Sequence, residues 1–153
     1  MKISTMIAGA ALACAALPAW AAPDCAPNTP QEARVVEDVI RAFYREAASE
    51  RVEAAARLTT PDFYAYEGER QSWPQLYQSL ADARARGVVI QWNLGPIDVR
   101  LGCDMAWAAW ENHGAAGKPP EVKPVTWLES MALTRVDGAW RIAFLHAHRI
   151  QVK

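Results

Sequence analysis

The sequence has little excess charge of either sign and little histidine. Its 153 residues include 16 Lys+Arg, 17 Asp+Glu and 3 His, which gives a net charge of −1. A balanced chain has no basic surface of the kind that binds nucleic acid, so we expect no nucleic-acid partner. The length fits one ordinary domain and excludes a TIM barrel or a two-lobed dinucleotide-binding enzyme.

Several catalytic motifs are also missing. The chain contains no G-x-S-x-G, no P-loop and no G-x-G-x-x-G. No spacing resembles H-E-x-x-H, and His146 and His148 on one strand would supply only two metal ligands. We therefore expect neither a metal ion nor a cofactor.

One apolar run is present, at the N-terminus. Residues 1–21 carry Lys2 as their only charge and end in small residues suited to signal peptidase. The pattern predicts a secretory signal peptide over 1–21, an irregular arm over 22–28 and one domain over 29–153. The mature protein would then be periplasmic or secreted, with no membrane association. A transmembrane helix, or a lipoprotein acylated at Cys14, is the alternative.

The cysteines are few, and their number suits an exported protein. Cys14 would leave with the signal peptide, so Cys25 and Cys103 would remain as an even pair. We expect a disulfide between them, which would stabilise the fold by roughly 4–5 kcal/mol through chain entropy. Two free thiols are the alternative.

Helices are expected in the first part of the domain. Thr29, Pro30 and Glu32 form a capping-box pattern that begins a helix ending near residue 49. A short second helix follows over 50–58. Ser72 and Gln75 begin a third helix, which ends at Gly87.

Strands are expected in the second part, after one short aromatic strand between the second and third helices. From residue 88 the apolar residues recur at every second position. Asp137 and Gly138 indicate a tight hairpin turn. The predicted strands cover 63–66, 88–101 with a break near Gly95, 105–113, 125–136 and 139–152, and the stretch 114–124 is predicted as a loop.

Two passages resemble a known family. The sequence Asp137-Gly138-Ala139-Trp140-Arg141-Ile142, followed by His146, resembles the last hairpin of the nuclear transport factor 2-like superfamily, in its SnoaL-like branch. The stretch Leu58-Thr59-Thr60-Pro61-Asp62-Phe63 is similar to that family's passage into its first strand. Together the two resemblances extend over nearly the whole predicted domain.

The resemblance implies a fold and a range of functions. The expected architecture is an α+β cone, in which three N-terminal helices pack in the concave face of a curved, mostly antiparallel sheet around a pocket. Members of the superfamily include isomerases, cyclases, dehydratases and non-enzymatic binders, so the fold does not fix the activity. Glu67 lies near the position of the isomerase branch's carboxylate base. Tyr44 lies later than that branch's helix tyrosine and is not a candidate here.

Strand alternation suggests which side chains line the pocket. In the last strand, Trp140, Ile142, Phe144, His146 and His148 share one face, which we expect to point inward because it carries large apolar groups. Carboxylates and histidines in an apolar cavity can acquire pKa values suited to proton transfer. The candidate catalytic residues are His146, Glu129 and Glu67. The candidate ligand-binding residues are Tyr64, Tyr66, Trp107, Glu111, Trp127, Phe144 and His148, with His113 as a further polar candidate.

Three functions remain open from the sequence. The first is an exported domain that binds a small, largely apolar molecule. The second is an isomerase, cyclase or lyase that acts on a small hydrophobic carbonyl compound by acid/base chemistry. The third is a non-catalytic interaction module. Trp107 and Trp110 have opposite parity on one strand, so one of them points outward, and we expect a homodimer through the outer sheet face.

Overall fold

The computed structural model describes residues 29–150. The predicted signal peptide (1–21), the arm (22–28), Cys14 and Cys25 lie outside the described residues. The predicted disulfide therefore has one half outside them. Cys103 lies half-buried in the turn between strands β4 and β5.

The first helix, α1 (Pro30–Ala48), begins as predicted but uses Glu32 differently. The Thr29 hydroxyl accepts a hydrogen bond from the Glu32 backbone N–H at 3.2 Å. The Glu32 carboxylate does not complete a capping box, because it accepts from Trp140 Nε1 at 2.7 Å and pairs with Arg135. The start of α1 is thus tied to the last hairpin of the chain.

Two shorter helices complete the helical layer. Helix α2 spans Val52–Ala56, and α3 spans Trp73–Ala85. The Gln75 side chain accepts from the Ser72 backbone N–H at 2.8 Å, which is the carboxamide half of the predicted capping box. Gly87 follows α3 with φ of +78°, a conformation that favours glycine at a helix end.

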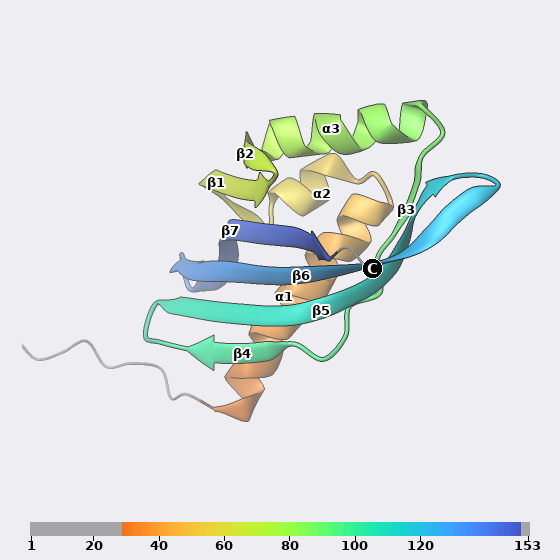
Figure 1. Ribbon diagram of the computed structural model, residues 1–153. Coiled ribbons are helices and arrows are strands. Elements are labelled where there is room, and N and C mark those ends of the chain that lie inside the picture. The colour runs from red at the N-terminus through yellow and green to blue at the C-terminus, as the bar shows by residue number, and fades with distance from the viewer. Residues whose placement is uncertain (1–28, 151–153) are drawn as a thin grey trace, which may run out of the picture.

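The strands form one strongly curved sheet (Figure 1). Its order is β2-β1-β7-β6-β5-β3, with β4 also paired to β5. Only β1 and β7 run parallel; the other neighbours are antiparallel. The strands are β1 (Thr59–Glu67), β2 (Glu69–Ser72), β3 (Val89–Gln91), β4 (Asp98–Leu101), β5 (Met105–Lys118), β6 (Glu121–Val136) and β7 (Ala139–Ile150).

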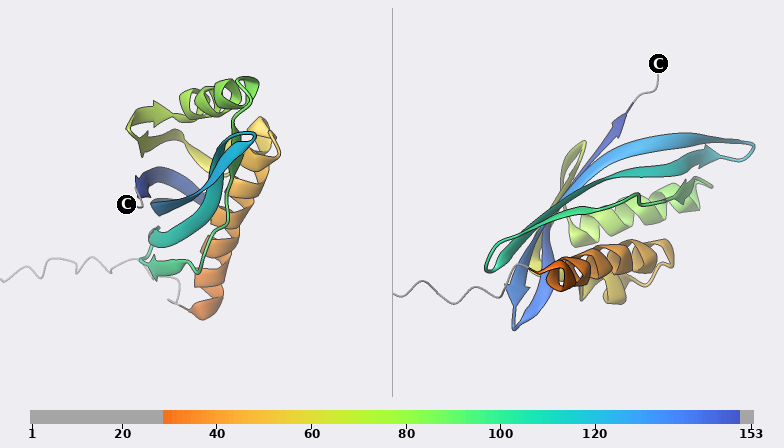
Figure 2. Two further views of the ribbon diagram at one scale, coloured as in Figure 1. Left: turned by 45° about the vertical axis from the view of Figure 1, so that its right-hand side comes forward. Right: turned by 90° about the horizontal axis from the view of Figure 1, so that it is seen from below.

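All three helices lie on one side of this sheet (Figure 2). Their apolar residues pack against the inward residues of the strands, and the core includes Ile40, Phe43, Met131, Leu133 and Ile142. This arrangement confirms the predicted α+β cone with helices in the concave face.

The predicted loop over 114–124 is instead the far end of a long hairpin. Residues Gly114 to Lys118 pair with Val125 to Glu121. Glycine allows this close packing, because a Cβ on Gly114 would lie 1.9 Å from the Gln91 carbonyl oxygen. The glycines that suggested a loop therefore reflect tight packing of β5, at Gly114 against β3 and at Gly117 against β6.

Strand β7 contains a β-bulge that sequence alternation did not predict. Ala132 of β6 pairs with Phe144, and the next residue, Leu133, pairs with Ile142. Ala143 is thus the extra residue, and the bulge reverses which residues face the helices beyond it. Ile142 and Leu145 are both buried, so the inward face continues through Leu145 rather than through Phe144.

Candidate functional site

The concave side of the sheet and the helices enclose a cavity of about 490 Å³. Its wall is mostly apolar. Aromatic and aliphatic side chains come from α1, α3, the β3 region and β6: Phe43, Tyr44, Trp73, Leu76, Trp92 and Trp127. Two carboxyl groups, those of Glu67 and Glu129, also reach this wall.

Glu129 is the buried polar centre of the site. Only 5% of the residue is exposed, although it lies in the middle of β6. Its Oε2 accepts hydrogen bonds from Trp110 Nε1 at 2.7 Å and from Asn112 Nδ2 at 3.0 Å. Both donors lie on β5, where Trp110 pairs directly with Glu129. The neighbouring strand therefore positions the carboxyl group.

Tyr44 of α1 contacts the same carboxyl group from the helical side. Its hydroxyl makes a side-chain hydrogen bond with Glu129, and burial together with the Glu129 charge raises the pKa of Tyr44 well above 10.0. The Tyr44 ring packs edge-on against Trp92 and Trp110, at 5.5 Å and 6.0 Å between ring centroids. Tyr44 is thus held as a neutral hydrogen-bond donor.

The protonation of Glu129 is set mainly by its burial. Loss of hydration raises the pKa of Glu129 from its ordinary 4.5 to about 7. Hydrogen bonds from Asn112, Tyr44 and Trp110 lower this pKa, and the charge of Glu67 raises it slightly. The group can therefore exist in both protonation states near neutral pH, as a general acid or base requires.

Glu67 lies at the end of β1, on the same inward row as Glu129. Glu129 pairs with Ala147 of β7. Tyr66 pairs with His146 on the parallel strands β1 and β7, so the next residues along these strands, Glu67 and Ala147, lie side by side. The small Ala147 side chain therefore separates the two acids across three neighbouring strands. Glu67 is partly open to solvent at the end of its strand, and its loss of hydration against the cavity wall raises its pKa above 4.5.

Four predicted site residues of β1 and β7 lie on the outer face instead. Tyr64 pairs with Phe144, and Tyr66 pairs with His146. The three aromatic rings cluster there, with Tyr64 and Phe144 5.1 Å apart between centroids. The bulge at Ala143 explains the outward Phe144 and His146. On β1, the opposite residues Phe63 and Ala65 take the buried positions.

Two predicted site residues of β5 also point outward. Trp107 is 48% exposed and Glu111 is exposed, and Glu111 lies 3.2 Å from His113 Nε2. The inward positions of this strand belong to the even-numbered residues. They begin with Ala106 and Ala108, which are fully buried and small. They continue with Trp110 and Asn112.

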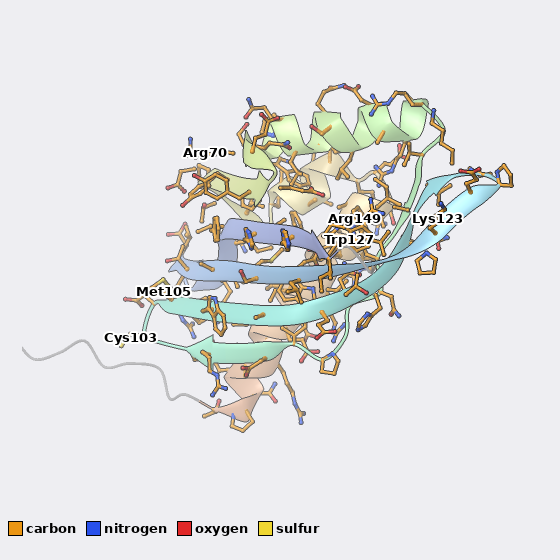
Figure 3. The ribbon with its side chains drawn as sticks, in the orientation of Figure 1. Arg70, Cys103, Met105, Lys123, Trp127 and Arg149 are labelled. Atoms are coloured by element: carbon orange, nitrogen blue, oxygen red, sulfur yellow. The ribbon has the colours of Figure 1, made fainter. Side chains whose placement is uncertain are left out.

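The other candidates do reach the cavity. Trp127, Glu129 and Glu67 line its wall, and His148 contributes to its rim. Arg149, which follows His148, lines the cavity beside Trp127 (Figure 3). Across residues 29–150, no three His, Cys, Asp or Glu side chains gather in a way that could hold a metal ion.

Sequence reasoning missed three residues of the site: Tyr44, Trp110 and Asn112. Trp110 and Asn112 share a parity with Ala106 and Ala108, so alternation grouped them correctly, but the prediction assigned the opposite parity, that of Trp107 and Glu111, to the cavity, which was wrong. Tyr44 was set aside because of its position in the helix. The available signal for the burial of Tyr44 was its position next to Phe43, which belongs to the apolar stripe of the helix.

Comparisons with known proteins agree on the fold. A family model described as a SnoaL-like domain matches residues 36–148. No curated protein matches the chain with significance. Among the described residues, no helix has both the length and the apolar character needed to cross a membrane.

Three similar solved structures illustrate the range of proteins with this fold. A proposed dehydratase of the NTF2-like family from Streptomyces avermitilis has 19% identity and a TM-score of 0.68, over 81% of this chain and 100% of that one. A ketosteroid isomerase-like protein from Erwinia carotovora atroseptica has 17% identity and a TM-score of 0.65, over 81% and 100%. The CamKII hub homology domain from Chlamydomonas reinhardtii has 16% identity and a TM-score of 0.64, over 78% and 99%. At these identities the likeness establishes the fold alone.

Proposed function

Because this chain belongs to the SnoaL-like domain family, we propose that its cavity binds a small, mostly apolar molecule with a hydrogen-bonding group at Glu129. One observation carries the proposal. A buried carboxyl group lies in the wall of an apolar cavity of about 490 Å³ and is held by side chains from two different elements. Apolar pockets with a few fixed polar groups are typical of small-molecule sites.

The protonated form of Glu129 fits a carbonyl ligand. Below its pKa of about 7, the carboxyl group has a proton that it can donate to a ligand oxygen. Above that pKa, the buried group is an anion, and a ligand carbonyl would be repelled from it. Ligand affinity should therefore fall as pH rises through about 7.

A matched pair of ligands tests this proposal. Carvone and limonene share a small cyclic apolar skeleton, and only carvone has a carbonyl group. We expect carvone to bind more tightly than limonene below pH 7, and the preference to shrink above it. Titration followed by tryptophan fluorescence suits the site, because Trp73, Trp92 and Trp127 line the cavity. Equal affinities at all pH values, or no binding of either compound, would contradict the proposal.

Acid/base catalysis is the second candidate function, and the Glu67–Glu129 arrangement favours it. Both acids reach one cavity and both have raised pKa values. One carboxylate could remove a proton from a carbon next to a carbonyl while the other carboxyl group returns a proton elsewhere. His146, on the outer face, has no part in this scheme.

The same carvone samples distinguish an enzyme from a binder. In deuterated water, an acid/base catalyst would incorporate deuterium next to the carbonyl, which NMR detects, and a binder would not. Glu129→Gln and Glu67→Gln should each reduce the incorporation. Glu111→Gln, an exposed carboxylate on the outer face, is the matched control.

Homodimerisation through the outer sheet face is part of the proposal as well. Its support is a set of large apolar residues exposed on that face, including Trp107 and Leu128 at 48% and 43% exposure. Small residues, Ala109, Ser130 and Ala132, lie among them on the paired strands. Large exposed apolar patches commonly mark contact surfaces.

Export and the Cys25–Cys103 bridge also remain proposals. They rest on the apolar N-terminal residues 1–21 and on the even cysteine pair left after cleavage. The intact mass of the protein recovered from the periplasm, with and without reductant, tests both. An uncleaved mass, or two thiols that alkylate without reductant, would contradict them.

A further inference from the structure

Arg149 lies on the cavity side of β7, near the end of the strand. It pairs with Trp127 of β6, and directly opposite residues of antiparallel strands point to the same face. Trp127 is buried and lines the cavity, and Arg149 lines it too. Figure 3 shows the two side chains next to each other at the end of the sheet where the β5–β6 hairpin extends. A cation therefore lies at the mouth of an apolar cavity.

Within residues 29–150, the Arg149 guanidinium has no carboxylate at ion-pair distance. By strand register, the two cavity acids are the carboxylates best placed to pair with Arg149. Both lie next to Ala147, which is two residues before Arg149 on the same strand. Neither acid forms an ion pair with Arg149, whereas Arg41, for example, pairs with Glu37 at 2.8 Å. The positive charge at the mouth is therefore available to a ligand.

The surface next to the mouth adds further positive charge. A groove continues from the cavity and shares Val88, Ala116 and Arg149 with it. The strand ends of the β5–β6 hairpin contribute Lys118 and Lys123 to this groove, and Glu121 is the one carboxylate among its lining residues. Neither lysine forms an ion pair with a described residue. Clustered cations at an opening attract anionic ligands and raise their local concentration.

We infer that the ligand is an amphipathic carboxylate, with its apolar body inside the cavity and its anionic group at Arg149. This inference rests on the proposed small-molecule function and adds the chemical class of the ligand. The apolar wall and the acids Glu67 and Glu129 disfavour an anion in the interior. Arginine binds carboxylates through charge-assisted, often paired hydrogen bonds, so the mouth is the favourable position for the anionic group.

Decanoate and decanol are the probes for this inference, since they share an apolar chain and differ in charge. Binding is followed by tryptophan fluorescence at constant pH. We expect decanoate to bind about tenfold more tightly than decanol, as one charge-assisted interaction would give. Added salt should weaken decanoate binding and leave decanol binding unchanged.

Variants at Arg149 test whether this residue causes the preference for decanoate over decanol. Arg149→Gln should reduce decanoate affinity by about tenfold and leave decanol affinity within about twofold. Arg149→Lys, which keeps the charge, should retain most of the decanoate preference. The control is Arg100→Gln, an exposed arginine on β4 that pairs with Asp98 away from the cavity. It should change neither affinity.

Two results would overturn the inference, and they separate it from the proposed function. If decanol binds but Arg149→Gln leaves decanoate affinity unchanged, the anionic ligand class is wrong and the apolar binding function stands. If neither probe binds the wild-type protein, the inference fails, and the carvone and limonene titrations show separately whether the proposed function stands.

Discussion

The inner and outer faces of the sheet have similar residue types but very different surroundings. The inner face has Trp110, Trp127 and Glu129, which are all buried, and Trp110 donates a hydrogen bond to Glu129. The outer face has Trp107 and His146, which are exposed. Only the inner face is covered by helices, so only there does an acid lose its hydration and acquire a pKa of about 7.

This contrast shows that the chemical role of a side chain on this sheet depends on whether the helices cover it, rather than on its residue type. Trp107 and Trp110 are three residues apart on one strand. Trp110 donates a hydrogen bond to the Glu129 carboxyl group, whereas Trp107 faces outward. His146 lies on the outer face and does not line the cavity. Glu129 combines an unusual pKa with a space for a ligand.

The largest expected effect comes from removing the inner tryptophan. Trp110→Ala should lower the free energy of unfolding by about 3–5 kcal/mol, because it deletes a buried aromatic group. It also removes the Nε1 donor to Glu129. Urea unfolding followed by circular dichroism measures the change.

Trp107→Ala is the matched outer-face control. In the monomer it should cost less than about 1 kcal/mol, because the side chain is 48% exposed. The same variant should weaken self-association in sedimentation experiments if the outer face forms the proposed dimer. Equal losses of stability for the two variants would remove the distinction between the faces.

The next effect is a pH dependence of stability that arises from Glu129. Its pKa is about 7 in the folded protein and near 4.5 when exposed, so between these values the folded state binds one more proton than the unfolded state. Stability from this group is fully present below pH 4.5 and is lost as pH rises through 7. The loss amounts to about 3 kcal/mol.

Glu129→Gln removes this titration and keeps a side chain of similar shape. The difference in unfolding free energy, variant minus wild type, should therefore rise by about 3 kcal/mol between acidic and mildly alkaline pH. Glu111→Gln, on the outer face, should show no comparable rise. A flat difference for Glu129→Gln would mean that the carboxyl group titrates normally.

Much of the fold could be predicted from local sequence signals. Thr29 and Pro30 begin α1, and Asp137 and Gly138 form the last hairpin turn with positive φ values of 51° and 77°. These signals act over a few residues and need no tertiary information. The period-two pattern also placed Trp127 and Glu129 on one face of β6, which is the cavity face.

The remaining features of the site depend on long-range packing. Alternation divides β5 into two faces, each with a tryptophan, and only packing against the helices decides which face is inner. The bulge at Ala143 changes the parity of β7 without a local signal such as glycine or proline. Tyr44 joins the site because α1 packs on the concave side of the sheet and brings Tyr44 to Glu129, which no spacing within the helix could reveal.

The most direct test of the account is an NMR titration of the Glu129 side-chain carboxyl carbon, assigned by comparison with Glu129→Gln. The account predicts a midpoint at about 7, which saturation of the cavity with a carbonyl ligand should move upward because the ligand binds the protonated form. A midpoint near 4.5 that a bound ligand does not change would contradict the central claim that Glu129 is the functional group of this cavity.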